Sequence, residues 1–206
     1  MEHDRQNHWQ QVYGEKAEDA VSWYQLEPSL SLHLIGKAAL APDDPVIDIG
    51  GGASVLVDHL LDAGHKDVTV LDIAHTGMAK ARARLGDRAG EVNWIVSDIT
   101  KFEPSRSYAL WHDRAAFHFL GEVSDRVRYR EVLDLALRPA GHAIIATFEM
   151  GGPEICSGLP VTRYSAESLE AELGSNYTLL EDHMELHQTP WNSEQRFLYT
   201  LFRKRA

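Results

Sequence analysis

The sequence is short of cysteine, of positive charge and of long apolar runs. Cys156 is the only cysteine in 206 residues, which excludes an intrachain disulfide and argues against a cysteine-based metal cluster. No stretch of about 18 consecutive apolar residues exists, so we expect no membrane span. The opening residues, MEHDRQNHWQQ, are polar and lack the apolar core of a signal peptide. We therefore expect a soluble, reduced, cytoplasmic protein.

The charge balance bears on the partners. There are 31 acidic and 20 basic residues, which gives a formal net charge of -11. Nucleic acids and anionic membranes attract basic surfaces, so the acidic excess argues against both as the main partner. A hydrophobic content of 44% over this length is enough for one well-buried domain and short for two.

From Pro45 onward, short apolar segments alternate with helical patterns, which predicts a parallel sheet covered on both faces. Residues 1–44 have helical spacing and several aromatic side chains. We predict an N-terminal helical cap over 1–44 and an α/β domain over 45–206. The expected strands are 46–49, 68–72, 92–96, 108–112, 142–148, 177–187 and 195–202; the expected helices lie near 54–63, 75–85, 124–137 and 165–174.

A glycine turn follows the first strand in "VIDIGGGAS". Gly50, Gly51 and Gly52 let the backbone come close to a ligand, where a Cβ atom would collide. The nicotinamide dinucleotide fingerprint needs a further glycine at position 55, which is Val55 here. Asp48 would also repel a pyrophosphate, whereas it suits a cofactor with an ammonium group. The turn therefore disfavours a nicotinamide cofactor.

Two further acids follow the next two strands. Asp72 ends the second strand, where a carboxylate accepts hydrogen bonds from ribose hydroxyls. Asp98 follows the third strand, where it can accept from an adenine amino group. Taken singly, Asp72 could be a helix cap and Asp98 a turn residue. Their order at successive strand ends indicates a cofactor with adenine, ribose, a positive tail and no phosphate, and S-adenosylmethionine fits.

The stretches "VIDIGGGAS", "VLDIA" and "WIVSDIT", continued by "YALWHDRAAFHFL" and "LRPAGHAIIATF", resemble the class I S-adenosylmethionine-dependent methyltransferases. The resemblance covers residues 45–206. It implies a doubly wound, Rossmann-like, mostly parallel seven-stranded sheet in the order 3-2-1-4-5-7-6, with strand 7 antiparallel. Many members have a third glycine where this chain has Ser54.

The resemblance also implies positions for the cofactor. Its methionine part would lie along Asp48 and the glycine turn, its ribose at Asp72 with the adjacent Ile73, and its adenine at Asp98 with Ile99.

Methyl transfer is an in-line displacement, so the enzyme mainly aligns its substrates and needs a base only when the acceptor carries a proton. The acceptor should lie beyond the carboxyl end of the fourth strand, where His112 is the candidate base and also a cofactor contact. Asp113 and Arg114 either orient the acceptor or cofactor carboxylate or pair with each other; we favour the ion pair. Cys156 is expected to be an apolar filler.

Aromatic residues of the cap are candidates for the pocket. Tyr13 and Trp23 are expected to contact the cofactor and Tyr24 to take part in catalysis, because aromatic faces attract a sulfonium or a cationic acceptor. Together with Arg114 and His112 they complete the predicted site, which contains no metal. The turn between the two closing strands, with His187 and Trp191, either reaches over the site or is a surface turn.

The leading hypothesis is a methyltransferase for a small-molecule acceptor, with a thiol slightly favoured over an amine or oxygen because thiols ionise readily. The alternative is a protein lysine methyltransferase, whose entrance the acidic Glu15, Glu18 and Asp19 would suit. A non-catalytic cofactor-binding module ranks lower, and an NAD oxidoreductase lower still. The sequence carries no signal for an oligomeric state.

Overall fold

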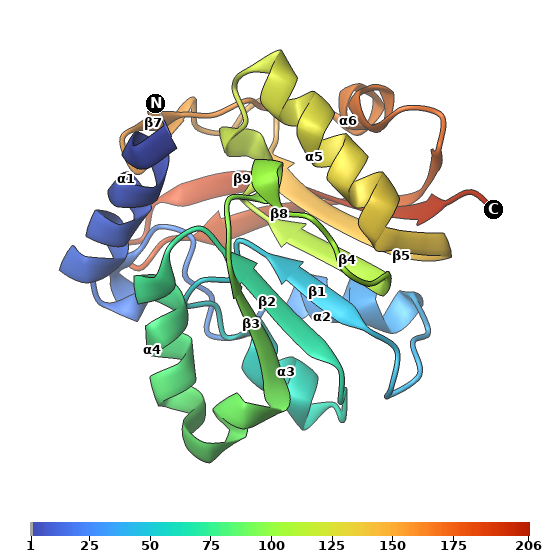
Figure 1. The fold of residues 1–206 in the computed structure, drawn as a ribbon. Coiled ribbons are helices and arrows are strands. Elements are labelled where there is room, and N and C mark those ends of the chain that lie inside the picture. Colours follow the sequence, from blue (N-terminus) through green and yellow to red (C-terminus); the bar gives the residue numbers. More distant parts are fainter. Residues whose placement is uncertain (1) are drawn as a thin grey trace.

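A single seven-stranded sheet organises the chain (Figure 1). The computed structural model describes residues 2–206, with side chains from residue 5 onward. The strand order is β3-β2-β1-β4-β5-β9-β8, and β9 runs antiparallel to both of its neighbours. The predicted order 3-2-1-4-5-7-6 is confirmed; the labels differ because a two-stranded ladder, β6–β7, precedes the closing hairpin.

The seven strands of the main sheet match the predicted segments, and four of them, β4, β5, β8 and β9, are longer than expected. Backbone pairing with β5 extends β4 to Arg114, and β5 itself starts at Leu137, directly after the preceding helix. The strands are β1 (Val46–Ile49), β2 (Val68–Asp72), β3 (Val92–Val96), β4 (Tyr108–Arg114), β5 (Leu137–Phe148), β6 (Ile155–Cys156), β7 (Leu159–Pro160), β8 (Tyr177–Gln188) and β9 (Glu194–Lys204).

The α-helices are α1 (Glu2–Glu15), α2 (Ser29–Lys37), α3 (Leu56–Asp62), α4 (His75–Leu85), α5 (Val123–Ala136) and α6 (Ala166–Leu173). Short 3-10 turns are η1 (Glu18–Ala20), η2 (Gly86–Glu91), η3 (Ile99–Lys101) and η4 (Phe117–Phe119). None of the helices in the described part of the chain combines the length and the apolar composition needed to cross a membrane.

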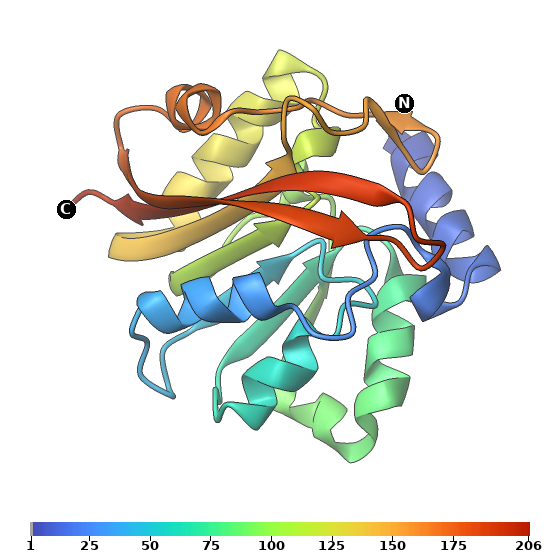
Figure 2. The same ribbon diagram turned by 180° about the vertical axis from the view of Figure 1, so that it is seen from behind.

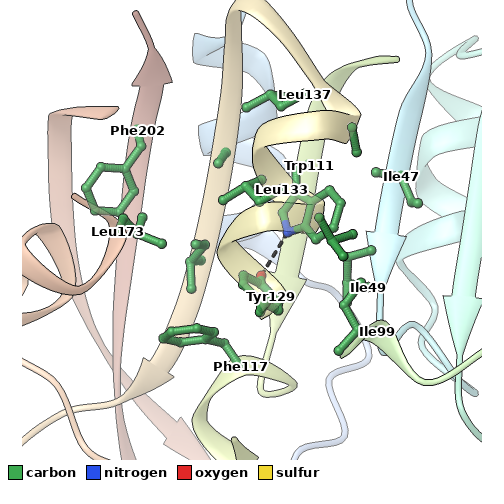
Figure 3. Close-up of a cluster of buried hydrophobic side chains, with 14 of the residues drawn as sticks. Ile47, Ile49, Ile99, Trp111, Phe117, Tyr129, Leu133, Leu137, Leu173 and Phe202 are labelled. Carbon is green, nitrogen blue, oxygen red and sulfur yellow. Dashed lines mark hydrogen bonds between the residues drawn. The ribbon is translucent and has the colours of Figure 1, made fainter. Parts of the chain in front are cut away.

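Helices cover both faces of the sheet, and each face has its own apolar cluster. On one face α5 and α6 pack on Ile47, Ile49 and Trp111, where Trp111 Nε1 donates a hydrogen bond of 2.8 Å to the Tyr129 hydroxyl (Figure 3). On the other face α2, α3 and α4 pack on alternate residues of the same strands, such as Val46 and Leu110. This alternation follows from the period of two along a strand.

The helix α1 lies apart from these layers. It contacts α4 beside the edge where β1, β2 and β3 end (Figure 1). Gln6 Nε2 donates to the Ile73 carbonyl at 3.0 Å, and Gln10 Oε1 accepts from the Thr76 amide at 3.1 Å. The helix is therefore held against the carboxyl edge of the sheet. The predicted division into a cap over 1–44 and a domain over 45–206 stays a prediction.

Candidate functional site

A cavity with an empty volume of about 1300 Å³ lies at the carboxyl edge of the sheet, beneath the N-terminal segment. Its walls come from the turns after β1 to β5 and from the first 31 residues. Every predicted site residue except Gly52 lines it: Tyr13, Trp23, Tyr24, Asp48, Gly50, Gly51, Asp72, Ile73, Asp98, Ile99, His112 and Arg114. Gly52 lies next to it, against the Tyr13 side chain.

The glycine turn forms one end of the cavity. Gly50 and Gly52 have φ of 68° and 42°, in the left-handed region that favours glycine. A Cβ on Gly51 would lie 2.6 Å from Asp48 Oδ2, so this position has no room for a side chain. Ser54 Oγ accepts a hydrogen bond of 3.1 Å from the Leu56 amide at the start of α3. The backbone of the turn thus forms a surface that a ligand can approach closely.

Asp72 lies at the end of β2 with its carboxylate against the glycine turn. Oδ1 accepts from the Ala74 amide at 2.7 Å, while a Cβ on Gly52 would lie 3.0 Å from Oδ2. Burial raises the pKa of Asp72 to about 7, with a further contribution from the nearby Asp48 charge. A buried carboxylate with a perturbed pKa beside a glycine turn is a strong candidate for a ligand contact.

Asp98 is held by two other elements. Its Oδ1 accepts from the amide and hydroxyl of Thr100, at 2.9 and 2.8 Å, which is the turn role considered from the sequence. Its Oδ2 lies 3.3 Å from Nη1 of Arg5, and Arg5 also pairs with Asp125. Arg5 thereby ties α1 to the third strand end. Sequence reasoning missed Arg5, because nothing in its neighbourhood indicates a partner 93 residues away.

A buried hydrogen-bonded chain joins Asp48, His112 and Ser31. His112 Nδ1 lies 2.7 Å from Asp48 Oδ1, and Nε2 lies 2.9 Å from Ser31 Oγ. Asp48 and His112 face each other directly across the parallel pair β1–β4. Because a carboxylate only accepts, Nδ1 carries a proton toward Asp48, and in this tautomer Nε2 can accept from the Ser31 hydroxyl. All three residues line the cavity. Sequence reasoning missed Ser31, which reaches the site through the packing of α2.

Arg114 does not pair with Asp113, so the favoured ion pair is wrong. The strand β4 continues through both residues, and neighbouring side chains of a strand point to opposite faces. Asp113 accepts from the Tyr129 hydroxyl at 2.7 Å and from the amides of Ala116 and Phe117 on the α5 side. Burial raises the pKa of Asp113 to about 6. Asp113 thus shapes the turn after β4.

Arg114 points into the cavity from the opposite face. Its Nε donates to the Tyr199 hydroxyl at 2.6 Å and its Nη1 to the Trp23 carbonyl at 2.8 Å. The guanidinium carbon lies 4.4 Å from the centre of the Phe197 ring, a cation–π contact. Nη2 is buried without a hydrogen bond in the described residues; the Glu185 carboxylate is 3.7 Å away. This atom is available to a polar group of a ligand.

The segment 21–25 closes this side of the cavity through contacts with distant strands. Gln25 Nε2 donates to Glu185 at 3.1 Å, and the Tyr199 hydroxyl donates to the same carboxylate at 3.1 Å. His187 lies 2.7 Å from the Ser22 carbonyl. Glu185 and Tyr199 were missed from the sequence because they lie on the last two strands. The turn between β8 and β9 lies at the carboxyl edge of the sheet, and Trp191 in this turn is 56% exposed.

Aromatic rings complete the roof of the cavity. Trp9 packs edge-on against Phe119 and Trp23, with centroids 4.9 and 5.8 Å apart. The ring of Tyr13 fits between the glycine turn and α4, where a Cβ on Gly77 would lie 3.0 Å from it. Cys156 is buried and lies 3.8 Å from Ser22 Oγ, with its pKa raised by burial. His118 is fully buried.

Comparison with known families and proteins agrees with this geometry. Residues 46–141 match a family model described as a methyltransferase domain. A mouse (Mus musculus) protein, eEF1A lysine and N-terminal methyltransferase, is 26% identical over 156 residues, or 74% of this chain. A malonyl-[acyl-carrier protein] O-methyltransferase from Ilyobacter polytropus is 26% identical over 158 residues, or 73% of this chain. The chain spans 21% and 57% of the lengths of these two relatives.

Among solved structures, the N-methyltransferase NodS from Bradyrhizobium japonicum in complex with S-adenosyl-L-homocysteine superposes with a TM-score of 0.73. The match covers 96% of this chain and 98% of NodS at 19% sequence identity. It shows that the two chains share a fold.

Proposed function

Since residues 46–141 belong to the methyltransferase-domain family and the chain has the class I S-adenosylmethionine-dependent methyltransferase fold, we propose that it methylates a small-molecule acceptor. One observation carries the proposal. The glycine turn and the buried Asp72 and Asp48 line the same cavity as Arg114 and several aromatic rings. A cofactor site and an acceptor site thus share one enclosed space.

S-adenosylmethionine supplies an electrophilic methyl group on a sulfonium, and the residues present fit it. The turn has room for backbone approach only, and Asp72 Oδ2 is available to ribose hydroxyls. In this assignment Asp48 and the glycines hold the methionine part, Asp98 and Ile99 the adenine, and Tyr13 and Trp23 cover the cofactor. Asp98 Oδ2 is paired with Arg5, so Asp98 would accept a hydrogen bond from the adenine amino group only after the Arg5 side chain moves away.

The acceptor would bind beside Tyr24 and Arg114, with Arg114 Nη2 orienting a polar group of it. Tyr24 and Arg114 would hold the acceptor heteroatom in line with the methyl group that the bound cofactor would supply. An acceptor that carries a proton would pass it to the Ser31 oxygen while the Ser31 proton moves to His112 Nε2, which Asp48 supports through Nδ1. A thiol acceptor would ionise with less help from His112.

A lysine-bearing protein is the second candidate acceptor. A separate open hollow lined by Asp19, Glu27 and Glu185 adjoins the cavity and shares Tyr24 and Gln25 with it. Carboxylates at an entrance would attract a cationic side chain. The mouse relative is named for lysine methylation, whereas the bacterial relative is named for an acyl-carrier-protein ester, so acceptors differ among similar chains.

Two experiments test these proposals. Calorimetric titration with S-adenosylmethionine and with NAD should show binding of the first alone; binding of NAD alone would refute the cofactor assignment. The enzyme is then incubated with methyl-labelled cofactor and cell extract before and after size filtration. Label in the small-molecule fraction supports the proposal, and label confined to protein favours the lysine alternative. Cofactor binding without label transfer to either fraction would favour the non-catalytic module. A cytoplasmic location stays a prediction from the sequence.

A further inference from the structure

One face of the edge strand β8 alternates glutamate and histidine. The residues are Glu181, His183, Glu185 and His187, at the spacing of two that places side chains on the same face of a strand. A register irregularity between Leu179 and Glu181 starts this stripe. Such a bulge re-aims the side chains that follow it. The stripe lies on the side where the N-terminal segment and α2 approach the terminal hairpin (Figure 2).

The two halves of the stripe have different partners. Glu185 and His187 are bonded to Gln25, Tyr199 and the Ser22 carbonyl, as described for the cavity. Glu181 and His183 instead face α2, where the imidazole ring of His33 lies 6.0 Å from that of His183, centre to centre. The inner half therefore fastens the segment 21–25, while the outer half is accessible to a ligand from solution.

The outer half has the spacing of a metal site. His183 Nε2 lies 3.2 Å from Glu181 Oε2, and one ligand atom from each of His33, Glu181 and His183 lies within 4.8 Å of the others. Ligand atoms about 2.0–2.2 Å from a tetrahedral Zn²⁺ are separated by roughly 3.3 Å. The Glu181–His183 pair already meets this spacing. His33 is exposed and reaches it by a rotation of its side chain.

We propose that His33, Glu181 and His183 bind a Zn²⁺ ion, with water as the fourth ligand. Two imidazoles and one carboxylate are a common protein ligand set for Zn²⁺, whereas Mg²⁺ and Ca²⁺ prefer oxygen ligands throughout. This site goes beyond the proposed function, because none of its three residues lines the cofactor cavity.

The one ammonium group beside the cluster does not block it. Lys37 Nζ lies 3.5 Å from Glu181 Oε1, on the oxygen that does not face His183. It can stay paired with Oε1 while Oε2 binds the ion. Lys37 would then orient the carboxylate, in the way that outer partners orient metal ligands.

Binding at this position would connect two elements of the active site. The helix α2 carries His33 and also Ser31, whose hydroxyl contacts His112 in the cavity. The strand β8 carries His183 and also Glu185, which holds Gln25. An ion bridging His33 to β8 would therefore stabilise α2 against the hairpin and the wall of the cavity with it. The expected effect is on stability, without a role for the metal in methyl transfer.

The test uses tag-free protein stripped with a chelator and titrated calorimetrically with ZnCl₂, with MgCl₂ as the control ion. We expect one Zn²⁺ per chain, no response to Mg²⁺, and a rise in the melting temperature with Zn²⁺. His33→Ala and His183→Ala should each weaken Zn²⁺ binding by at least about tenfold and abolish the thermal shift. His33 is exposed, so its variant should fold normally. Co²⁺ should give the visible absorption of a tetrahedral site.

A matched control variant is His59→Ala, which removes a histidine from α3, outside the cluster. It should bind Zn²⁺ like the unmodified protein. The proposal would be overturned if the unmodified protein bound no stoichiometric Zn²⁺, or if the His33→Ala and His183→Ala variants bound Zn²⁺ as tightly as the unmodified protein. Because the readouts are metal binding and melting temperature, failure here would leave the methyltransferase proposal untouched.

Discussion

The cavity has two halves that are built in different ways. The half proposed for the cofactor consists of Gly50–Gly52, Asp72 and Asp98, which lie at or within three residues of the ends of β1, β2 and β3. The acceptor half consists of the segment 21–25, Arg114 and residues of the last two strands, which meet only in the folded chain. Local sequence specifies the first half, and long-range contacts specify the second. The difference explains how a family keeps its cofactor while its acceptors vary.

The largest expected effect is a loss of cofactor affinity on substitution of Asp72, which would leave the acceptor half unchanged. Asp72→Asn should weaken S-adenosylmethionine binding about 100-fold or more, because a buried acceptor for two hydroxyls is lost. It should leave the contacts of Arg114 unchanged. Calorimetry on the variant measures the affinity, and an unchanged affinity would remove the cofactor assignment.

The same variant should be more stable than the unmodified protein at pH 8. The pKa of Asp72 is raised to about 7, so the folded state holds this proton more tightly than the unfolded state. The bound proton therefore contributes favourably to the free energy of unfolding below about pH 4, and this contribution is lost as the pH rises through about 7. Above that pH the buried Asp72 charge destabilises the folded state. Replacing it with an amide should raise the free energy of unfolding at pH 8 by on the order of 1–3 kcal/mol. Denaturant titrations at pH 5 and pH 8 measure the difference.

The next effect is expected at the junction of the halves. For a proton-bearing acceptor, His112→Ala should lower turnover about 100-fold while changing cofactor affinity little, since a positioned base contributes roughly 10²–10⁴-fold. Ser31→Ala removes only the link to Nε2 and should have a smaller effect. Single-turnover rates and cofactor titrations separate the two quantities. Normal turnover in His112→Ala would show that His112 is not a base and that it only packs beside Asp48 and Ser31.

Cofactor affinity should also depend on pH. Because only the ionised Asp72 can accept strong hydrogen bonds through both carboxylate oxygens, the affinity for S-adenosylmethionine should fall about tenfold between pH 8 and pH 6, around its pKa of about 7. In Asp72→Asn this dependence should disappear. Calorimetry over the range measures it, and an equal slope in both proteins would assign the titration to another group.

The smallest effect concerns the acceptor half alone. Tyr199→Phe removes the hydroxyl that accepts from Arg114 and donates to Glu185, while Arg114 keeps its bond to the Trp23 carbonyl. We expect a rise in acceptor KM of about threefold to tenfold, the size of one hydrogen bond, with the cofactor affinity unchanged. Steady-state kinetics with each substrate varied in turn measure both. An equal loss of cofactor affinity would show that the halves are not separable.

The sheet and the cofactor half could be predicted because their signals are local. A glycine turn or an acid at a strand end is visible within a few residues, and the three strands that lead to them were bounded correctly. The contact of Asp48 with His112 required the register of β1 against β4, which the sequence does not contain.

The errors arose where an element was misjudged or its partner was distant. Ending the fourth strand at His112 placed Asp113 and Arg114 in a loop, where pairing is possible; in the strand their side chains diverge. Ser31, Arg5, Glu185 and Tyr199 act through contacts across the whole chain.

The position of Tyr13 has a consequence for the timing of the reaction. Its ring lies against Gly52 and Gly77, while Arg5, Gln6 and Gln10 fasten the same helix to the ends of β3 and β2 and to the start of α4. A molecule that enters or leaves the cofactor half must wait until these contacts open. We therefore expect departure of the spent cofactor, gated by α1, to limit the cycle, so that the first turnover is faster than those that follow it.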